Sequence, residues 1–393
     1  MGRRPHANEV KSTAWSYALT LCLLFTVSGV HAEAAEKTKP ALSGATEAAA
    51  RTAVKRGLDW LKELQREDGS WSSRNYPAMT ALPLWAFSRS EHPDKDKVCE
   101  KAAAFVASFA KENGGIYKPP GKVIPTGGLS TYNTAMSMTA LHAYDKRKYA
   151  EIILRARKFV AGSQLQGDSS NVGGFGYSHE GSGWRRRGDL SNTGWALMSM
   201  RKTQDMEDLR PSIEKRVDVD WEQALKFVEK LQNRDKDDDE HYGGFGYEQG
   251  AERGGTVEGK KDEKVRLRGY GSMTYAGLES MIYAQVDRTD PKVRSALEWA
   301  GKHWSVAENP GMGAKGLFYY YNIISKALSL FGTGALTDKD GKVIPWQDQL
   351  VGKLIADQSK DGSWVNKDNS LWEGNPVLVT SYAILTLEYV LGQ

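Results

Sequence analysis

The chain has 393 residues, of which 40% are hydrophobic and 26% are charged, so it is long enough to bury a large core. Its net charge is only +4, and half of that lies in residues 1–32. A charge this small excludes bulk electrostatic attraction to nucleic acid, and we expect no nucleic-acid partner.

The first residues have the three-part pattern of a secretory signal peptide. Arg3, Arg4 and Lys11 precede an apolar run over residues 18–27, and residues 30–32 supply a cleavage site. The apolar run is shorter than a typical membrane span. We therefore expect export to the periplasm or to the outside of the cell.

Removal of residues 1–32 would leave Cys99 as the only cysteine. No intramolecular disulfide and no cysteine-based zinc cluster could then form, and we expect neither a metal nor a cofactor. Residues 33–50, rich in Ala, Glu, Lys, Ser and Thr, have the composition of a flexible lead-in.

The rest of the chain contains a repeat. An amphipathic helix over residues 51–65 leads into the heptapeptide 65–71, and residues 358–364 repeat its Q-x-x-D-G-S-W pattern. Weaker glycine–aromatic turns lie between these two, at residues 113–117, 173–177, 243–247 and, least clearly, 316–319.

Helices of two kinds flank these turns. The helices before the turns carry charge on one face, which indicates an outer position; besides 51–65 they are predicted at 98–111, 150–164, 220–232 and 290–304. The helices after the turns are apolar on most sides, which indicates burial, and share a hydroxyl at their start: Thr80, Thr134, Thr193, Thr274 and Ser381. Six outer–inner hairpins predict an all-α fold, a single (α/α)6 toroid over residues 51–391.

With these motifs in view, the chain resembles the terpene cyclase and protein prenyltransferase superfamily, and within it squalene–hopene cyclase. The heptapeptides 65–71 and 358–364 are similar to the Q-W repeat of that family. The resemblance implies an α/α toroid whose central cavity accepts a polyisoprenoid chain.

The resemblance also points to a candidate catalytic segment. The family's acid motif, D-x-D-D-T, is matched by Asp189-Leu190-Ser191-Asn192-Thr193, in which Asp189 and Thr193 agree with the motif. Ser191 stands where the family has its proton-donating aspartate, and a serine hydroxyl cannot protonate an alkene. The candidate catalytic residues are therefore Asp189, Ser191, Asn192 and Thr193, with helix capping as the alternative role.

Candidate ligand-binding residues lie near the predicted starts of the inner helices. The polar and aromatic ones are Tyr132, Asn133, Trp195, Thr274, Tyr275, Tyr320, Ser381 and Tyr382. Aromatic faces bind hydrocarbon chains and stabilise cations, although core packing is the commoner role. The basic ones, on loops before inner helices, are Arg185, Arg186, Arg187 and Arg268. They could hold an anionic head group or remain solvated.

Three functions are compatible with this reading. The first is an exported terpene cyclase-like or prenyltransferase-like protein that binds an isoprenoid or another apolar molecule, with proton-initiated cyclisation in doubt. The second is a non-catalytic toroid that binds a lipid or a protein partner. The third is a polysaccharide lyase-like α/α barrel, in which residues 185–187 would hold uronates. Peripheral contact with a membrane is compatible with the first two.

Overall fold

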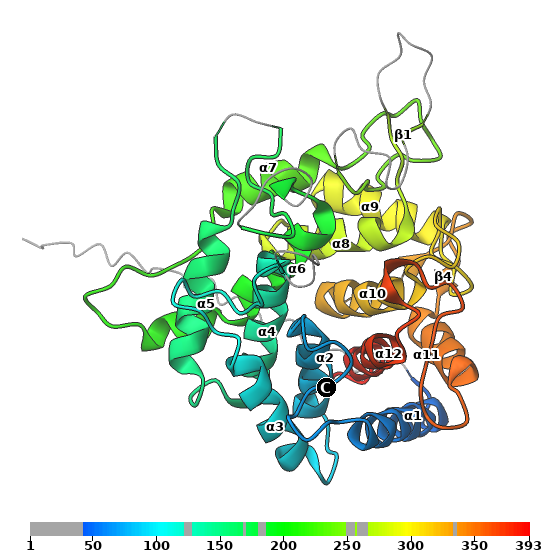
Figure 1. The fold of residues 1–393 in the computed structure, drawn as a ribbon. Helices are drawn as coiled ribbons and strands as arrows, with labels where there is room; N and C mark the ends of the chain where they lie inside the picture. Colours follow the sequence, from blue (N-terminus) through cyan, green and yellow to red (C-terminus); the bar gives the residue numbers. More distant parts are fainter. Residues whose placement is uncertain are drawn as a thin grey trace, which may run out of the picture. The chain divides into compact units, whose positions relative to one another are not determined.

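Two kinds of helix alternate along the chain in the computed structural model (Figure 1), which describes residues 42–121, 128–167, 170–179, 186–248, 256–257, 266–332 and 336–393. The outer helices are amphipathic: α1 (Gly44–Glu63), α3 (Lys95–Ala107), α5 (Ala150–Gly162), α7 (Trp221–Lys230), α9 (Pro291–Lys302) and α11 (Trp346–Asp357). The inner helices are mostly apolar: α2 (Ala78–Arg89), α4 (Ser130–Asp145), α6 (Leu190–Lys202), α8 (Gly271–Tyr283), α10 (Leu317–Phe331) and α12 (Pro376–Val390).

The inner helices form a closed ring. Each contacts the next one in the chain, and α12 contacts α2, so the last hairpin meets the first (Figure 1). The outer helices pack on this ring from outside, with α1 touching both α12 and α11. Residues 37–393 are thus one compact unit, and the predicted (α/α)6 toroid is confirmed.

Burial agrees with the two classes of helix. Every residue from Val377 to Val390 of α12 is buried, whereas α7 buries only Ala224, Phe227 and Val228. Within the described residues, no helix is long and apolar enough to cross a membrane.

The connections between the helices contain short secondary-structure elements. Strand β1 (Thr256–Val257) pairs with β2 (Arg266–Leu267), and β3 (Leu336–Thr337) pairs with β4 (Val343–Ile344), both antiparallel. The 3-10 helices η2 (Gln204–Leu209) and η3 (Ser370–Trp372) lie in loops.

The first helix begins earlier than predicted. The Ser43 hydroxyl accepts the Thr46 N–H at 3.1 Å and caps α1, so the helix starts at Gly44 rather than at residue 51. The end of the predicted lead-in is therefore helical. The predicted signal peptide, residues 1–32, lies outside the described residues.

The glutamine of the repeat links neighbouring outer helices. The Gln358 side-chain amide donates to the Gly362 carbonyl in its own turn and to the Ala53 carbonyl of α1, both at 2.9 Å. Three further glutamines make the same pair of contacts to the next outer helix or its cap: Gln65, Gln164 and Gln232. The turns at 173–177 and 243–247 are therefore true copies of the motif.

The glycine of the repeat allows the turn to approach the next outer helix. Gly362 has a φ of +98°, and a Cβ on it would lie 2.5 Å from the Arg56 carbonyl oxygen. Positive φ and contact with a neighbouring helix carbonyl recur at Gly69, Gly114, Gly173 and Gly243. The predicted turn at 316–319 is wrong, because Gly316 is the N-cap of α10.

The shared hydroxyl connects each turn to the inner helix that follows it. Thr193 Oγ1 accepts the Phe175 N–H at 3.0 Å, and Thr80, Thr134 and Thr274 make the equivalent bond. In the last repeat Thr380 accepts the Trp364 N–H at 2.9 Å, so the prediction of Ser381 for this role is wrong by one residue.

The glycine contact can be tested against a matched control. Gly362→Ala should lower the unfolding free energy by at least about 3 kcal/mol. Alanine would be strained in the left-handed backbone conformation, and its Cβ would also overlap the Arg56 carbonyl of α1. Gly341→Ala, at a φ of +76° with no atom within 4 Å of its Cβ, should lose only about 1–2 kcal/mol. Urea denaturation measures both, and equal losses would contradict the proposed close approach.

Candidate functional site

The start of α6 carries the candidate acid segment. Asp189 is the N-cap: Oδ1 accepts the Asn192 N–H at 2.8 Å, and Oδ2 accepts the Asn192 side-chain amide at 2.7 Å. The side chain of Asp189 is buried, and the Tyr247 hydroxyl also bonds to its carboxylate. Both oxygens of the only carboxylate in this segment therefore serve the helix end.

Burial raises the pKa of Asp189 from 3.8 to about 7, although the bonds from Asn192 and Tyr247 oppose the shift. A carboxyl group with this pKa stays protonated up to about neutral pH, so the pKa is not what argues against Asp189 as a proton donor. The geometry does, because both of its oxygens are bonded to Asn192 at the helix end.

Ser191 points into the ring. Its hydroxyl lies 2.9 Å from the hydroxyl of Tyr319 on α10, although α8 separates α6 from α10 around the ring. The Ser191–Tyr319 bond therefore lies inside the ring, across the inner side of α8. Unlike the Ser191 hydroxyl, the Thr193 hydroxyl contacts a turn: its Oγ1 accepts the Phe175 N–H, the turn contact that the threonines of the other repeats also make.

Tyrosines surround the Ser191–Tyr319 bond. Tyr319 and Tyr382 have ring centroids 6.1 Å apart, and Tyr382 shares a hydrogen bond with Tyr132. The Tyr132 ring lies 6.3 Å from that of Trp195, one turn along α6 from Ser191. Ser191, Tyr132, Trp195, Tyr319 and Tyr382, here called the tyrosine cluster, come from four inner helices.

Three other predicted ligand residues form hydrogen bonds that stabilise the turns and helix ends of the fold. Asn133 accepts the Ala78 N–H at 3.1 Å and donates to the carbonyls of Gly128 and Leu129. Thr274 binds the Phe245 N–H, and the Ser381 hydroxyl bonds to the Val377 carbonyl of its own helix. The side-chain hydrogen bonds of all three are thus within the protein scaffold.

Tyr320 faces away from the axis. Its hydroxyl donates to the Ser305 carbonyl, in the loop after outer helix α9, and its ring packs on Tyr275 at 5.9 Å. Successive residues of a helix differ in direction by about 100°. The inward tyrosine of α10 is therefore Tyr319, and the prediction of Tyr320 was one residue off.

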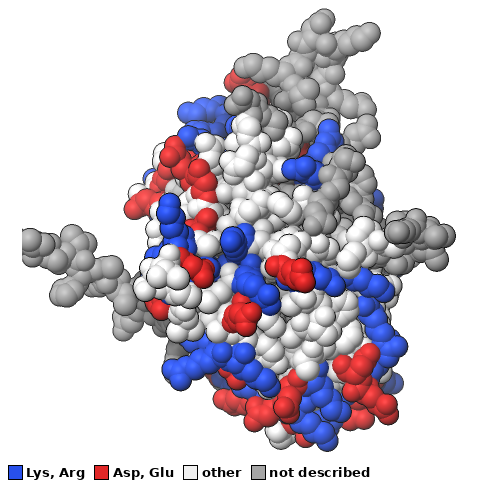
Figure 2. Space-filling view, turned by 60° about the vertical axis from the view of Figure 1, so that its left-hand side comes forward, with Lys and Arg blue, Asp and Glu red and all other residues white. Residues whose placement is uncertain are grey.

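The predicted arginines do not form one group. Arg186 and Arg187 are exposed, and the Arg187 guanidinium lies 3.9 Å from the Glu248 carboxylate. Arg268 is exposed as well, while Arg185 lies outside the described residues. On the face that Figure 2 shows, basic and acidic side chains are interspersed.

Further along the axis the interior becomes charged. Lys326 of α10 lies 3.4 Å from Glu279 of α8, and its Nζ is 4.2 Å from the centroid of the Trp195 ring on α6. Both charged side chains are almost fully buried. This part of the ring is therefore not a hydrocarbon-lined tunnel.

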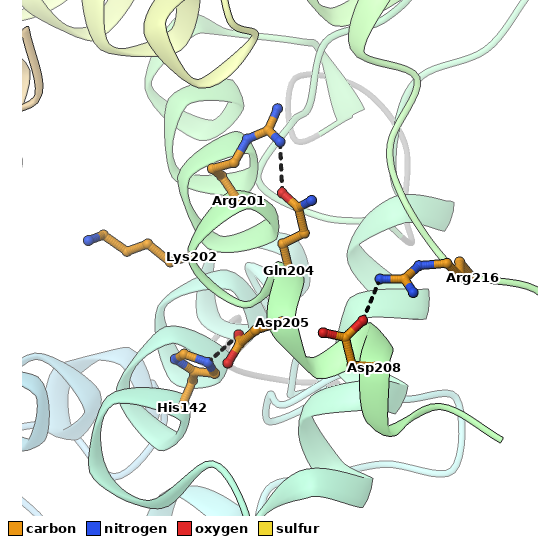
Figure 3. A pocket seen from close by; sticks show the side chains of 7 residues that line it. All are labelled: His142, Arg201, Lys202, Gln204, Asp205, Asp208 and Arg216. Carbon is orange, nitrogen blue, oxygen red and sulfur yellow. Dashed lines mark hydrogen bonds and ion pairs between the residues drawn. The ribbon is translucent and has the colours of Figure 1, made fainter. Parts of the chain in front are cut away.

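A pocket of about 490 Å³ opens at the C-terminal end of α4 and α6 (Figure 3), lined by His142, Arg201, Lys202, Gln204, Asp205, Asp208 and Arg216. His142 bonds to Asp205 at 2.7 Å, and Arg216 to Asp208 at 2.9 Å. Lys202 extends away from the other six side chains (Figure 3), and its Nζ lies 5.4 Å from the Tyr389 ring centroid.

The described residues contain no group of three or more His, Cys, Asp or Glu side chains that could hold a metal ion. Cys99 lies on outer helix α3, as predicted, and burial raises the pKa of its thiol to about 12. A buried thiol that stays protonated is a poor metal ligand and a poor nucleophile.

Structural comparison identifies the fold. The chain is similar to the type II terpene cyclase MstE from Scytonema in complex with merosterolic acid A, with a TM-score of 0.55 and 11% identity over 89% of this chain and 99% of that one. A second MstE structure, in complex with its substrate geranylgeranyl dihydroxybenzoate, gives a TM-score of 0.54 and 10% identity, again over 89% of this chain and 99% of that one.

A glycosidase gives a TM-score of 0.50 and 11% identity over 89% of this chain and 99% of the other. Neither a sequence family nor a curated protein sequence matches the chain. The chain thus has the terpene cyclase-like α/α toroid fold, as the repeats indicated. At this identity the likeness establishes the fold alone.

The axial residues that the sequence did not single out include Tyr319, Lys326 and Glu279. Tyr319 belongs to a run of three tyrosines, and nothing in the sequence shows which of them faces inward. The signal for the charged pair was available, because Glu279 and Lys326 are isolated charges within otherwise apolar inner helices.

The raised pKa of Asp189 predicts a pH-dependent stability. Because its pKa in the folded protein, about 7, exceeds the ordinary 3.8, ionisation favours the unfolded chain. Relative to Asp189→Asn, which keeps a capping side chain, the wild type should lose up to about 4 kcal/mol of unfolding free energy between about pH 4 and pH 7.

Denaturation of both proteins at several pH values measures this difference. Asp220→Asn, at the exposed N-cap of α7, is the control for capping alone. A constant difference between wild type and Asp189→Asn across the range would contradict the buried carboxyl.

Proposed function

We propose that this protein is a terpene cyclase-like toroid that binds an apolar, isoprenoid-type ligand at the tyrosine cluster and does not carry out proton-initiated cyclisation. The observation that carries the proposal is the Ser191–Tyr319 bond inside the ring. It supports the proposal because Ser191, which matches the family's acid position, is a hydroxyl that faces inward beside aromatic side chains.

The aromatic side chains suit an apolar ligand. The rings of Tyr132, Tyr382 and Trp195 are packed together at the N-terminal end of the inner helices. Large aromatic surfaces bind hydrocarbon chains through burial of apolar area. The MstE substrate, geranylgeranyl dihydroxybenzoate, is a ligand of this chemical type on the same fold.

The residues at the motif position argue for binding without cyclisation. Ser191 is not an acid, and both carboxylate oxygens of Asp189 bond to Asn192 at the start of α6. The second hypothesis from the sequence was a non-catalytic toroid that binds a lipid. Our proposal agrees with it, because both have an apolar ligand bound without catalysis. The lyase-like alternative depended on the arginines at 185–187, and the two that are described are exposed.

Two expectations about the setting remain part of the proposal. Export rests on residues 1–32 of the sequence. Peripheral membrane contact is supported by Leu371 and Trp372, which are 57% and 49% exposed in the loop before α12. An exported protein that binds an isoprenoid would need to collect it from a lipid phase.

Ligand binding can be measured directly. Geranylgeraniol titrated into the purified protein should bind saturably in native mass spectrometry. Tyr319→Ala should weaken binding at least about tenfold, a loss of about 1.4 kcal/mol, because an aromatic wall is removed. Tyr144→Ala, a half-buried tyrosine outside the cluster, should bind like wild type. Equal affinity in all three proteins would exclude the tyrosine cluster as the site.

A gain-of-function variant tests the assignment of position 191. Ser191→Asp places a carboxylic acid beside the Tyr319 hydroxyl and should give a detectable cyclised product from squalene or geranylgeraniol by gas chromatography. Wild type and Ser191→Asn should give none. Cyclisation by wild type would refute the proposed loss of acid chemistry, and no product from Ser191→Asp would refute the match to the acid motif.

A further inference from the structure

The deep part of the ring axis contains buried polar atoms that have no hydrogen-bond partner among the described residues. Asn322 of α10 is fully buried, one helical turn before Lys326, and neither atom of its amide has a hydrogen-bond partner among the described residues. The same holds for the indole N–H of Trp195 on α6. Asn322 lies between Tyr319 and Lys326 along α10, and Trp195, a member of the tyrosine cluster, has Lys326 Nζ 4.2 Å from its ring centroid.

The Lys326–Glu279 pair leaves hydrogen-bonding capacity free. The Lys326 ammonium lies 3.4 Å from Glu279 Oε2, and the other carboxylate oxygen, Oε1, has no partner among the described residues. The Lys326 ammonium also lies 3.7 Å from the sulfur of Met198 on α6. The two charges thus balance each other while their hydrogen bonds remain incomplete.

A second pair lies at the end of the ring. Glu388 of α12 is fully buried, and its nearest cation is Arg89 of α2, with 3.4 Å between Arg89 Nε and Glu388 Oε2. Neither carboxylate oxygen of Glu388 is hydrogen-bonded within the described part of the chain. Arg89 stacks on the Tyr389 ring at 4.5 Å, and the Tyr389 hydroxyl is unpartnered there too.

Burial of polar atoms without hydrogen bonds has a large free-energy cost. A buried polar atom without a hydrogen bond destabilises the folded state, and a tightly folded ring could have filled these positions with apolar side chains. Asn322, Glu279 and Glu388 come from three different inner helices. Lys326, Glu279 and Glu388 all act electrostatically on the buried Tyr389, so the two pairs lie near each other, and their unsatisfied atoms indicate a polar binding site.

We propose that the deep part of the ring axis binds a neutral, hydroxyl-rich group such as a sugar ring, a role separate from binding of the apolar ligand. Each acidic side chain already has a basic partner, so the site has no demand for an ion. What remains is a mixture of acceptors, on Glu279 and Glu388, and donors, on Trp195 and Tyr389. Hydroxyl groups both donate and accept, and the aromatic faces pack against the C–H face of a ring.

Other ligand classes fit less well. A phosphate or carboxylate would face the carboxylates of Glu279 and Glu388, and an organic cation would face Lys326 and Arg89. An apolar chain would leave all of these atoms unsatisfied. The pocket of Figure 3 offers an approach from the C-terminal end, because Lys202 lines it and also lies over Tyr389.

The test is saturation-transfer NMR and calorimetry on the whole protein with glucose, N-acetylglucosamine, myo-inositol and inorganic diphosphate. At least one neutral compound should bind saturably. Asn322→Leu and Glu279→Gln should each weaken that binding at least tenfold. Ser325→Ala is the matched control, because this buried hydroxyl of α10 is already bonded to the Asn322 carbonyl and should not affect binding.

Stability separates a binding role from a structural one. If Asn322 serves a ligand, Asn322→Leu should keep or raise the melting temperature of the ligand-free protein while losing the sugar. Three results would overturn the proposal: no neutral compound binds, diphosphate alone binds, or Asn322→Leu binds the sugar as wild type does. The geranylgeraniol titration is a separate measurement, and its failure would leave this proposal standing.

Discussion

The ring depends on one contact that is repeated around its circumference. A glutamine at the end of an outer helix donates to its own turn and to the next outer helix, as Gln358 does to Gly362 and Ala53. The turn glycine makes this possible, since a side chain there would overlap the neighbouring helix carbonyl. The contact from Gln358 reaches α1 and so joins the two ends of the ring. In the closed ring the inner helices surround one common axis.

That axis has two regions of different chemistry. Near the starts of the inner helices, aromatic rings surround the Ser191–Tyr319 bond. Farther along, the Lys326–Glu279 and Arg89–Glu388 pairs place buried charge where a cyclase-like fold suggests a hydrocarbon cavity. In our proposals the apolar ligand therefore occupies the aromatic region, and a polar ligand occupies the charged region.

The repeats allowed the fold to be predicted because each copy encodes the same contacts, within its own turn and to the next outer helix. The candidate site was predicted less well, for a geometric reason. A shift of one residue on a helix turns a side chain by about 100°, so Tyr320 was chosen where Tyr319 faces the axis, and Ser381 where Thr380 binds the turn. The Lys326–Glu279 pair joins residues of two different repeats, so the sequence shows each isolated charge but not that the two side chains meet.

The central claim is that the axis of the ring, and not its outer surface, holds the ligand. A crystal structure of the protein with geranylgeraniol tests this most directly. The account predicts electron density between Tyr319 and Trp195, with the Ser191–Tyr319 bond broken or displaced. Density on the outer helices, with the tyrosine cluster unchanged, would contradict it.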